Sequence, residues 1–129
     1  MDQQVRRKNN TTLDTGIYKL TCSDCPSFYI GQTGRSFKQR FKEHTKDIGK
    51  MNPESRFALH INDTQHNYTD MDTNLSILYK ITKGDTMNRI EEFEIYKNRS
   101  NQFLLNNKIN TTTNKLYDII LNKNYHSRR

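Results

Sequence analysis

Residues 16–31 read GIYKLTCSDCPSFYIG and set the expected fold of this chain. Two runs of strand-favouring residues, Gly16–Cys22 and Ser27–Gln32, flank a Ser-Asp-Cys-Pro sequence that is typical of a turn. The stretch therefore predicts a β-hairpin. Because the two strands of a hairpin are neighbours, Tyr18 and Tyr29 are expected to lie on adjacent strands of one sheet.

The segments after the hairpin show either helical or strand-like spacing of their apolar residues. We expect helices over residues 36–48, 54–60, 86–98 and 115–123, the first with Ser36 as its N-cap, and a third strand over residues 75–81. The apolar residues of that strand, which alternate with polar ones, are Leu75, Ile77, Tyr79 and Ile81. The alternation predicts a half-buried strand. The order of elements predicts an α+β domain in which helices flank a small antiparallel three-stranded sheet.

The length and composition suit one domain with a small core, since the chain has 129 residues of which 32% are hydrophobic. We expect a flexible basic N-terminal tail over residues 1–12, the folded domain over residues 13–108, and a basic helix or tail over residues 109–129. The formal net charge is +7. A basic surface favours phosphate backbones through counterion release, which makes DNA the expected partner. A solvated, nonspecific charge excess explains the charge equally well.

No stretch of the sequence is long and apolar enough to cross a membrane. No apolar segment follows the N-terminal basic residues, as a signal peptide requires. We therefore expect a soluble intracellular protein that makes no contact with a membrane. In a reducing compartment, the two cysteines are expected not to form a disulfide.

The helix expected over residues 36–48 carries groups that suit phosphodiester hydrolysis. Arg40 and His44 are spaced i,i+4 and therefore share one face of the helix. Two nearby phenylalanines would anchor that side against the sheet, close to the two hairpin tyrosines. Arginine offers a fixed charge whose fork fits a phosphate, and tyrosine offers a positioned hydroxyl. Taken alone, Arg40 is more readily explained as a surface charge of the helix.

The tripeptides Gly16-Ile17-Tyr18 and Tyr29-Ile30-Gly31, followed by a helix with Arg40 and His44, resemble the motifs of the GIY-YIG nuclease family. The resemblance implies the fold of those nucleases and a metal-dependent endonuclease that hydrolyses phosphodiester bonds of DNA. It also implies that Gly31 allows close packing of the strands at the second motif.

The resemblance implies a role for each of four side chains. Tyr18 would act at the attacking water as general base or proton relay, and Tyr29 would position that water or the phosphate. Arg40 would stabilise the phosphate. His44 matches the histidine found near this arginine in the homing-endonuclease and retroelement branches of the family.

The resemblance further implies a glutamate on a later helix that binds a catalytic Mg²⁺ or Mn²⁺. Glu92 fits best because of the aromatic and aliphatic residues that follow it, with Glu91 as the second candidate and Glu94 as the third. Any one of them could instead be a solvated residue of the helix face. Asn106, with Asn107 beside it, matches the asparagine that the family has beyond this helix.

Cys22 and Cys25 have the C-x2-C spacing of a zinc knuckle, in which two thiolates from one turn bind one ion. A structural zinc site usually has four ligands, and His60 and His66, separated by five residues, are the obvious source of the other two. Zinc would tie the hairpin turn to the segment after the first helix and stiffen a domain with a small core. A redox pair and two unrelated small residues of the core are the alternatives.

The C-x2-C motif between the two tripeptides, with two histidines downstream, resembles the GIY-YIG endonuclease domain of Penelope-like retroelements. This implies a nuclear protein that nicks DNA to support retroelement integration, and a reverse transcriptase as the accompanying domain or protein. Three alternatives stay open: a catalytically silent, zinc-stabilised DNA-binding module, a branched-DNA repair nuclease of the same fold, and a zinc-stabilised protein-interaction domain.

Overall fold

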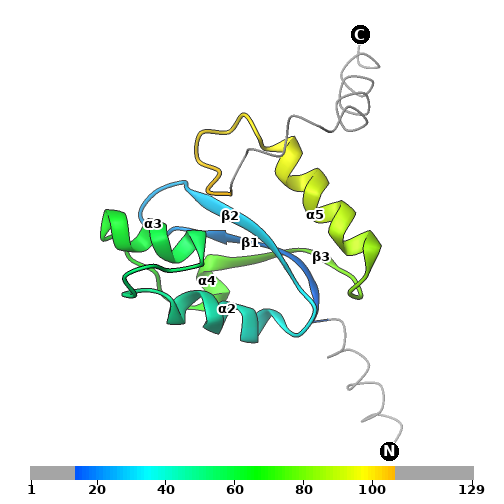
Figure 1. Cartoon of the computed structure of the whole chain (residues 1–129), viewed down its shortest axis with the longest axis horizontal. Coiled ribbons are helices and arrows are strands. Elements are labelled where there is room, and N and C mark those ends of the chain that lie inside the picture. The colour runs from blue at the N-terminus through cyan, green and yellow to red at the C-terminus, as the bar shows by residue number, and fades with distance from the viewer. Residues whose placement is uncertain (1–13, 107–129) are drawn as a thin grey trace, which may run out of the picture.

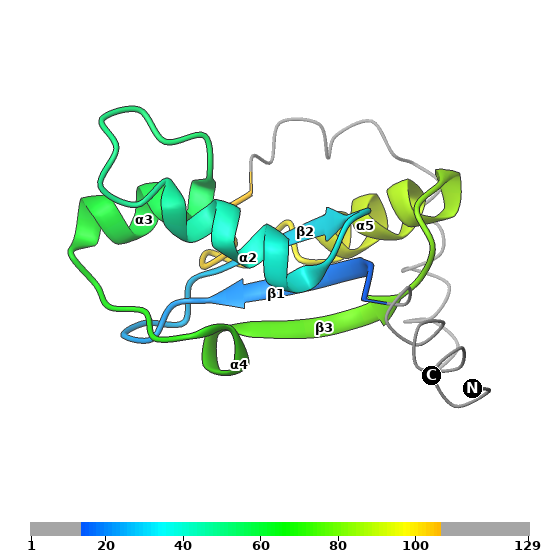
Figure 2. The same ribbon diagram turned by 90° about the horizontal axis from the view of Figure 1, so that it is seen from below.

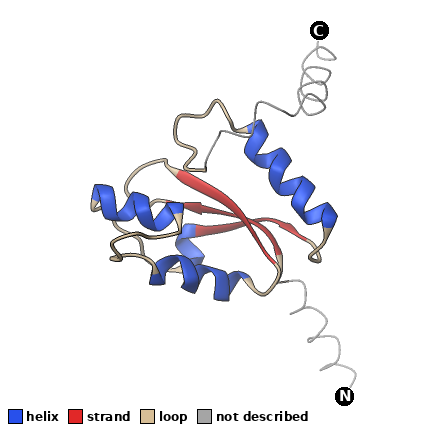
Figure 3. Cartoon of the chain, viewed as in Figure 1, coloured by secondary structure: helices blue, strands red, loops and turns tan. Residues whose placement is uncertain are grey.

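Three antiparallel strands form the centre of the structure, a computed structural model that describes residues 14–106 (Figure 1). The strands lie in the order β2-β1-β3, and helices surround the sheet (Figure 3). In chain order the elements are β1 (Gly16–Thr21), β2 (Phe28–Thr33), α2 (Phe37–Lys46), α3 (Arg56–Thr64), α4 (Met71–Asn74), β3 (Leu75–Lys80) and α5 (Asp85–Lys97). The predicted α+β architecture is confirmed. The helix predicted over residues 115–123 and the two predicted tails lie outside the described residues.

The hairpin of β1 and β2 has a register that puts its two tyrosines on one face of the sheet. Tyr18 pairs with Gly31 and Leu20 pairs with Tyr29. Residues opposite each other on neighbouring strands share a face, as do residues two positions apart on one strand. The rings of Tyr18 and Tyr29 are therefore diagonal neighbours, with their centroids 6.3 Å apart.

The sheet separates two small hydrophobic clusters. The cluster under α2 and α3 consists of Tyr18, Leu20, Cys22, Phe37, Phe57, Ile61 and Leu75. The cluster under α5 consists of Ile17, Phe28, Ile30, Met87 and Leu104. Figure 2 shows α2 and α3 next to each other and apart from α5. Tyr18 thus points toward α2 while its neighbour Ile17 points toward α5, as the alternation of a strand requires.

Strand β3 is more exposed than its alternating sequence predicts, with Ile77 43% and Tyr79 38% exposed. It is an edge strand, and its register with β1 shifts, because Tyr18 pairs with Ile77 whereas Ile17 pairs with Tyr79. Consecutive residues of β1 therefore pair with residues of β3 that are two positions apart. Leu78, between them, has no partner on β1 and is the extra residue of a β-bulge. Side chains beyond a bulge change faces, so no single apolar stripe runs along β3.

The helices begin close to the predicted positions, and their lengths differ by a few residues. The predicted N-cap of α2 is confirmed, since Ser36 Oγ accepts a hydrogen bond from the Gln39 N–H at 3.0 Å. Helix α3 continues four residues beyond its predicted end, to Thr64, and Gln65 ends it in the left-handed conformation with φ 61°. The four-residue helix α4 is too short to show a periodicity and was not predicted. Among residues 14–106, no helix is long and apolar enough to cross a bilayer.

The outer edge of β2 is closed by the segment that follows α5. Asn106 accepts a hydrogen bond from the Ile30 N–H at 2.9 Å and donates one to the Ile30 carbonyl at 2.7 Å. An isolated bridge between Phe28 and Leu104 lies beside it. These contacts satisfy backbone groups that an edge strand would otherwise leave open.

The glycines of the two tripeptides are required by close contacts. A Cβ atom on Gly31 would lie 2.5 Å from Tyr18 Oη and 2.7 Å from Tyr29 Cε2. Gly16 has φ +149°, and a Cβ there would lie 1.9 Å from the Tyr79 carbonyl oxygen. Neither position has room for a side chain, so both motifs require glycine there.

We expect Gly31→Ala to destabilise the domain by about 1–3 kcal/mol, because the added methyl group must push the Tyr18 ring aside. Gly34→Ala is the matched control, since its Cβ would meet only the flexible side chain of Lys83. Chemical denaturation of the two variants beside the wild type measures the difference. Equal midpoints for wild type and Gly31→Ala would contradict the expectation.

Candidate active site and metal centre

The hydroxyl group of Tyr18 is the centre of a hydrogen-bonded cluster on the α2 face of the sheet. Its Oη lies 2.7 Å from His44 Nε2 and accepts a hydrogen bond from Arg40 Nε at 3.2 Å. The ring of Tyr29 lies edge-on to His44, with the centroids 5.3 Å apart. The structure thus brings four of the expected site residues together around one hydroxyl.

His44 is a neutral imidazole in this cluster. Its side chain is buried, and burial followed by the charge of Arg40 lowers its pKa to about 4. A neutral imidazole has one nitrogen that donates and one that accepts. Nε2 faces Tyr18, and Nδ1 lies 2.6 Å from Ser55 Oγ. His44 is therefore able to take up a proton, as a general base must.

The two tyrosines remain protonated at physiological pH. Burial, and then the neighbouring Tyr29, raise the pKa of Tyr18 well above its usual range. Burial and then the charge of Glu91 raise the pKa of Tyr29. A phenol that does not ionise cannot by itself store a proton taken from water. Tyr18 needs an acceptor for its own proton, and His44 is in hydrogen-bond contact with it.

Arg40 is fixed in place by Glu43, one turn further along α2. The guanidinium of Arg40 donates to Glu43 Oε1 at 2.8 Å, and the same carboxylate pairs with Arg35. The Arg40 Nε that donates to Tyr18 is thus held by a second contact. Sequence reasoning missed Glu43, for which the i,i+3 spacing from Arg40 is the available signal.

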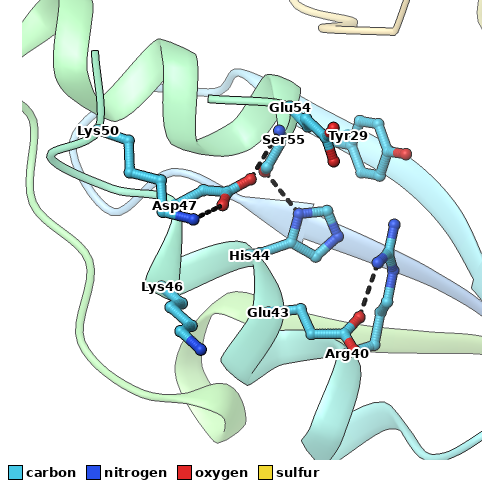
Figure 4. Close-up of a pocket in the computed structure, with 9 residues that line it drawn as sticks. All are labelled: Tyr29, Arg40, Glu43, His44, Lys46, Asp47, Lys50, Glu54 and Ser55. Carbon is cyan, nitrogen blue, oxygen red and sulfur yellow. Dashed lines mark hydrogen bonds and ion pairs between the residues drawn. The ribbon is translucent and has the colours of Figure 1, made fainter. Parts of the chain in front are cut away.

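A cleft of about 290 Å³ opens beside this cluster (Figure 4). It is lined by Tyr29, Arg40, Glu43, His44, Lys46, Asp47, Lys50, Glu54 and Ser55. These residues come from β2, from α2 and from the segment that leads into α3. The cleft gives a phosphate group access to Arg40 and to the histidine.

The three glutamates of α5 lie in different surroundings. Glu91 is half-buried, accepts a hydrogen bond from Gln32 Nε2 at 2.7 Å, and raises the pKa of both hairpin tyrosines by its charge. Glu92 is exposed to solvent. Glu94 is buried against β3, where it accepts a hydrogen bond from Tyr79 at 2.7 Å. Glu91 interacts electrostatically with Tyr18, Tyr29 and Arg40.

Gln32 holds Glu91 and Ser55 contacts His44, and sequence reasoning missed both. Gln32 directly follows the second tripeptide, and this adjacency is its only signal in the sequence. Ser55 is recognisable in the sequence only as a residue type that caps helices. Asn106, in contrast, forms both of its hydrogen bonds with the backbone of Ile30 and lies at the outer edge of β2.

A second cluster joins the hairpin turn to α3. One ligand atom from each of Cys22, Cys25, His60 and His66 lies within 4.8 Å of the others. Cys22 Sγ is 3.4 Å from His66 Nδ1, and Cys25 Sγ is 3.3 Å from His60 Nε2. Tetrahedral zinc with two thiolates and two imidazoles places its ligand atoms roughly 3.4–3.8 Å apart, so the donor set and the spacing fit zinc. Both cysteines are free of a disulfide.

Comparison with known proteins identifies one family. The family model described as the GIY-YIG catalytic domain matches residues 14–110, which is more than half of the chain. Searches among curated proteins and among solved structures found no match.

The neutral state of His44 predicts a dependence of stability on pH. Its pKa is lowered from 6.5 to about 4 on folding, so between these values the unfolded chain binds a proton that the folded chain does not. The contribution of His44 to stability is therefore complete above pH 6.5 and is lost as the pH falls toward 4. NMR titration of the His44 ring should give a midpoint near pH 4, and a midpoint above 6 would contradict a buried neutral imidazole.

We expect one zinc ion per chain at the cluster of two cysteines and two histidines. Chelation should lower Tm by roughly 10 °C or more, because a structural zinc ion contributes several kcal/mol to folding. Metal analysis and thermal unfolding before and after chelation measure both quantities, with Cys25→Ser as the variant that loses a ligand. Recovery of Tm with Zn²⁺ and not with Mg²⁺ is the control, and an unchanged Tm after metal removal would contradict the assignment.

Proposed function

The chain belongs to the GIY-YIG family of catalytic domains, which makes it a nuclease domain, and on that premise we propose that it is a metal-dependent endonuclease that nicks DNA. The observation that carries the proposal is the Tyr18 hydroxyl, which lies between His44 and Arg40 beside an open cleft. The formal charge of +7 supports a polyanionic substrate.

The arrangement supports a proton relay from water to His44. The buried Tyr18 does not itself line the cleft, so the attacking water must reach its hydroxyl past Arg40 and His44, which do. Tyr18 then takes a proton from that water and passes its own phenolic proton to His44 Nε2, 2.7 Å away. The resulting hydroxide attacks phosphorus, and the proton ends on a side chain that was neutral at the start. Tyr29, whose ring lines the cleft and lies edge-on to the histidine, positions the water or the phosphate.

Arg40 supplies the fixed positive charge of the site. Its guanidinium lies in the cleft and is oriented by Glu43, so it can bind the scissile phosphate without first being reorganised. Preorganised charge of this kind is worth most where negative charge develops, here on the pentacoordinate phosphorus.

We propose Glu91, rather than Glu92, as the ligand of the catalytic Mg²⁺ or Mn²⁺. A single carboxylate suits Mg²⁺, which keeps several waters and binds substrate phosphates. Glu91 is held by Gln32 and interacts with the tyrosines and Arg40, whereas Glu92 is exposed. When bound, the divalent ion would stabilise the charge on the phosphate and on the leaving oxygen. Burial raises the pKa of Glu91, so metal binding is expected to weaken when the pH falls.

The finer proposal is that this domain serves a Penelope-like retroelement, in the nucleus and together with a reverse transcriptase. It is supported by the cysteine pair between the two tripeptides and by the convergence of that pair with His60 and His66. In this proposal zinc is structural only. Two of the four ligands come from the turn of the hairpin and two from α3 and the segment that follows it, and none of the four lines the catalytic cleft.

A catalytically silent DNA-binding module is the second candidate, because the same fold, zinc cluster and basic charge would serve binding alone. The discriminating property is cleavage that depends on a divalent metal ion. The ordered contacts among Tyr18, Arg40 and His44 favour catalysis, since DNA binding alone does not require them.

Plasmid nicking in Mg²⁺ or Mn²⁺ tests the proposed function with two neighbouring glutamates. We expect Glu91→Gln to slow conversion of supercoiled to open-circle DNA by about a hundredfold or more, because several kcal/mol of charge stabilisation is lost. Glu92→Gln is the matched control one residue away and should remain near the wild-type rate.

Two outcomes would count against this assignment. A loss confined to Glu92→Gln would move the metal ligand to Glu92. Wild-type protein that is folded, loaded with zinc and bound to DNA, yet cleaves nothing in either metal, would favour the silent module.

A further inference from the structure

Ser55 lies at the point where α3 meets the catalytic histidine. It is the N-cap of α3, and its Oγ accepts a hydrogen bond from the Ala58 N–H at 3.0 Å. The same oxygen lies 2.6 Å from His44 Nδ1. The backbone N–H of Ser55 donates to Asp47 Oδ2 at 3.1 Å, so the residue is fixed by main chain and side chain together (Figure 4).

The hydrogen bonds around His44 determine which of its nitrogens carries the proton. Tyr18 is fully buried, and its hydroxyl already accepts from Arg40. Within the described part of the chain, His44 Nε2 is the acceptor available to the phenolic hydrogen. Nε2 must then be unprotonated, and the single proton of the neutral imidazole is on Nδ1 and points to Ser55. The hydrogen of the Ser55 hydroxyl can turn into the cleft that Ser55 lines.

The opposite arrangement leaves a buried group unsatisfied. If Ser55 donated to Nδ1, His44 would donate from Nε2 to Tyr18, whose oxygen would then accept twice. The phenolic hydrogen would be buried without an acceptor, at a cost of about 1–3 kcal/mol. The first arrangement satisfies every donor of Tyr18 and His44.

We propose that Ser55 is a positioning residue of the nuclease, whose hydroxyl oxygen holds His44 in the tautomer that accepts the proton of Tyr18. This rests on the proposed function, because the relay from Tyr18 to His44 is part of it. After the phenolic proton has moved to Nε2, Nδ1–H keeps its bond to Ser55, so the imidazolium is stabilised without rotation of the ring. Ser55 makes no contact with the reacting atoms and acts only through His44.

Four variants separate this role from the role of Ser55 as a helix cap. Ser55→Ala removes both roles, whereas Ser55→Gly removes the hydroxyl at a cost of only a few tenths of a kcal/mol in capping. Ser55→Asp caps the helix and can only accept from Nδ1–H, and it therefore keeps the proposed tautomer. Ser36→Ala, at the N-cap of α2, is the control that loses a cap without touching His44.

We expect Ser55→Gly and Ser55→Ala to lower kcat by about 10- to 100-fold with an unchanged KM for plasmid DNA. Ser55→Asp should stay within about tenfold of wild type, and Ser36→Ala should change Tm more than kcat. Wild-type kcat in Ser55→Gly, or loss of activity in Ser55→Asp with Tm retained, would overturn the proposal.

Long-range proton–nitrogen NMR spectra of His44 test the tautomer without reference to cleavage. The wild type and Ser55→Asp should show Nδ1 protonated and Nε2 unprotonated, and Ser55→Gly should show a mixture of the two. Protonated Nε2 in the wild type would overturn the proposal. If the wild type cleaved no DNA, the proposed function would fail, and these spectra would still decide the assignment of Ser55.

Discussion

The contact between the Tyr18 ring and Gly31 is the constraint on which the site depends. The ring lies across strand β2 at the one position without a side chain, where a Cβ would be 2.5 Å from the phenolic oxygen. Along this path the hydroxyl reaches the helix on that face of the sheet and meets Arg40 and His44. Protein interiors are packed tightly enough to fix the position of the Tyr18 hydroxyl oxygen. It can therefore contact both strand β2 and helix α2.

Polar contacts, more than a large hydrophobic core, hold the elements around the Tyr18 hydroxyl in place. Asp47 holds the backbone of Ser55, and Ser55 caps α3 and contacts the histidine. Further along the same helix, His60 belongs to the cluster that joins α3 to the hairpin turn. Helix α3 thus contacts His44 at its start and contributes to the candidate zinc ligands near its end. Only 32% of the residues are hydrophobic, so these contacts compensate in part for the small apolar area that the domain can bury.

Burial leaves the imidazole and the two phenols of the site neutral. It is the largest cause of the lowered pKa of His44 and of the raised pKa of Tyr18 and Tyr29, so neither the imidazolium nor a tyrosinate is favoured. In the proposed relay, a proton would therefore move from phenol to imidazole without first displacing a stable charge. The same proposal leaves the arginine for the phosphate and the glutamate for a divalent cation.

The sequence by itself determined the hairpin, the N-cap of α2 and the C-x2-C pair, because each depends on residues close together in the chain. The tertiary structure alone decided which glutamate of α5 approaches the tyrosines. Glu91 and Glu92 are adjacent in sequence and about 100° apart around a helix, so only the packing of α5 on the sheet distinguishes them. The bulge in β3 likewise depends on pairing with β1, and the contact of Ser55 with His44 depends on how α3 lies against α2. Their formation depends on register and docking, which local spacing does not encode.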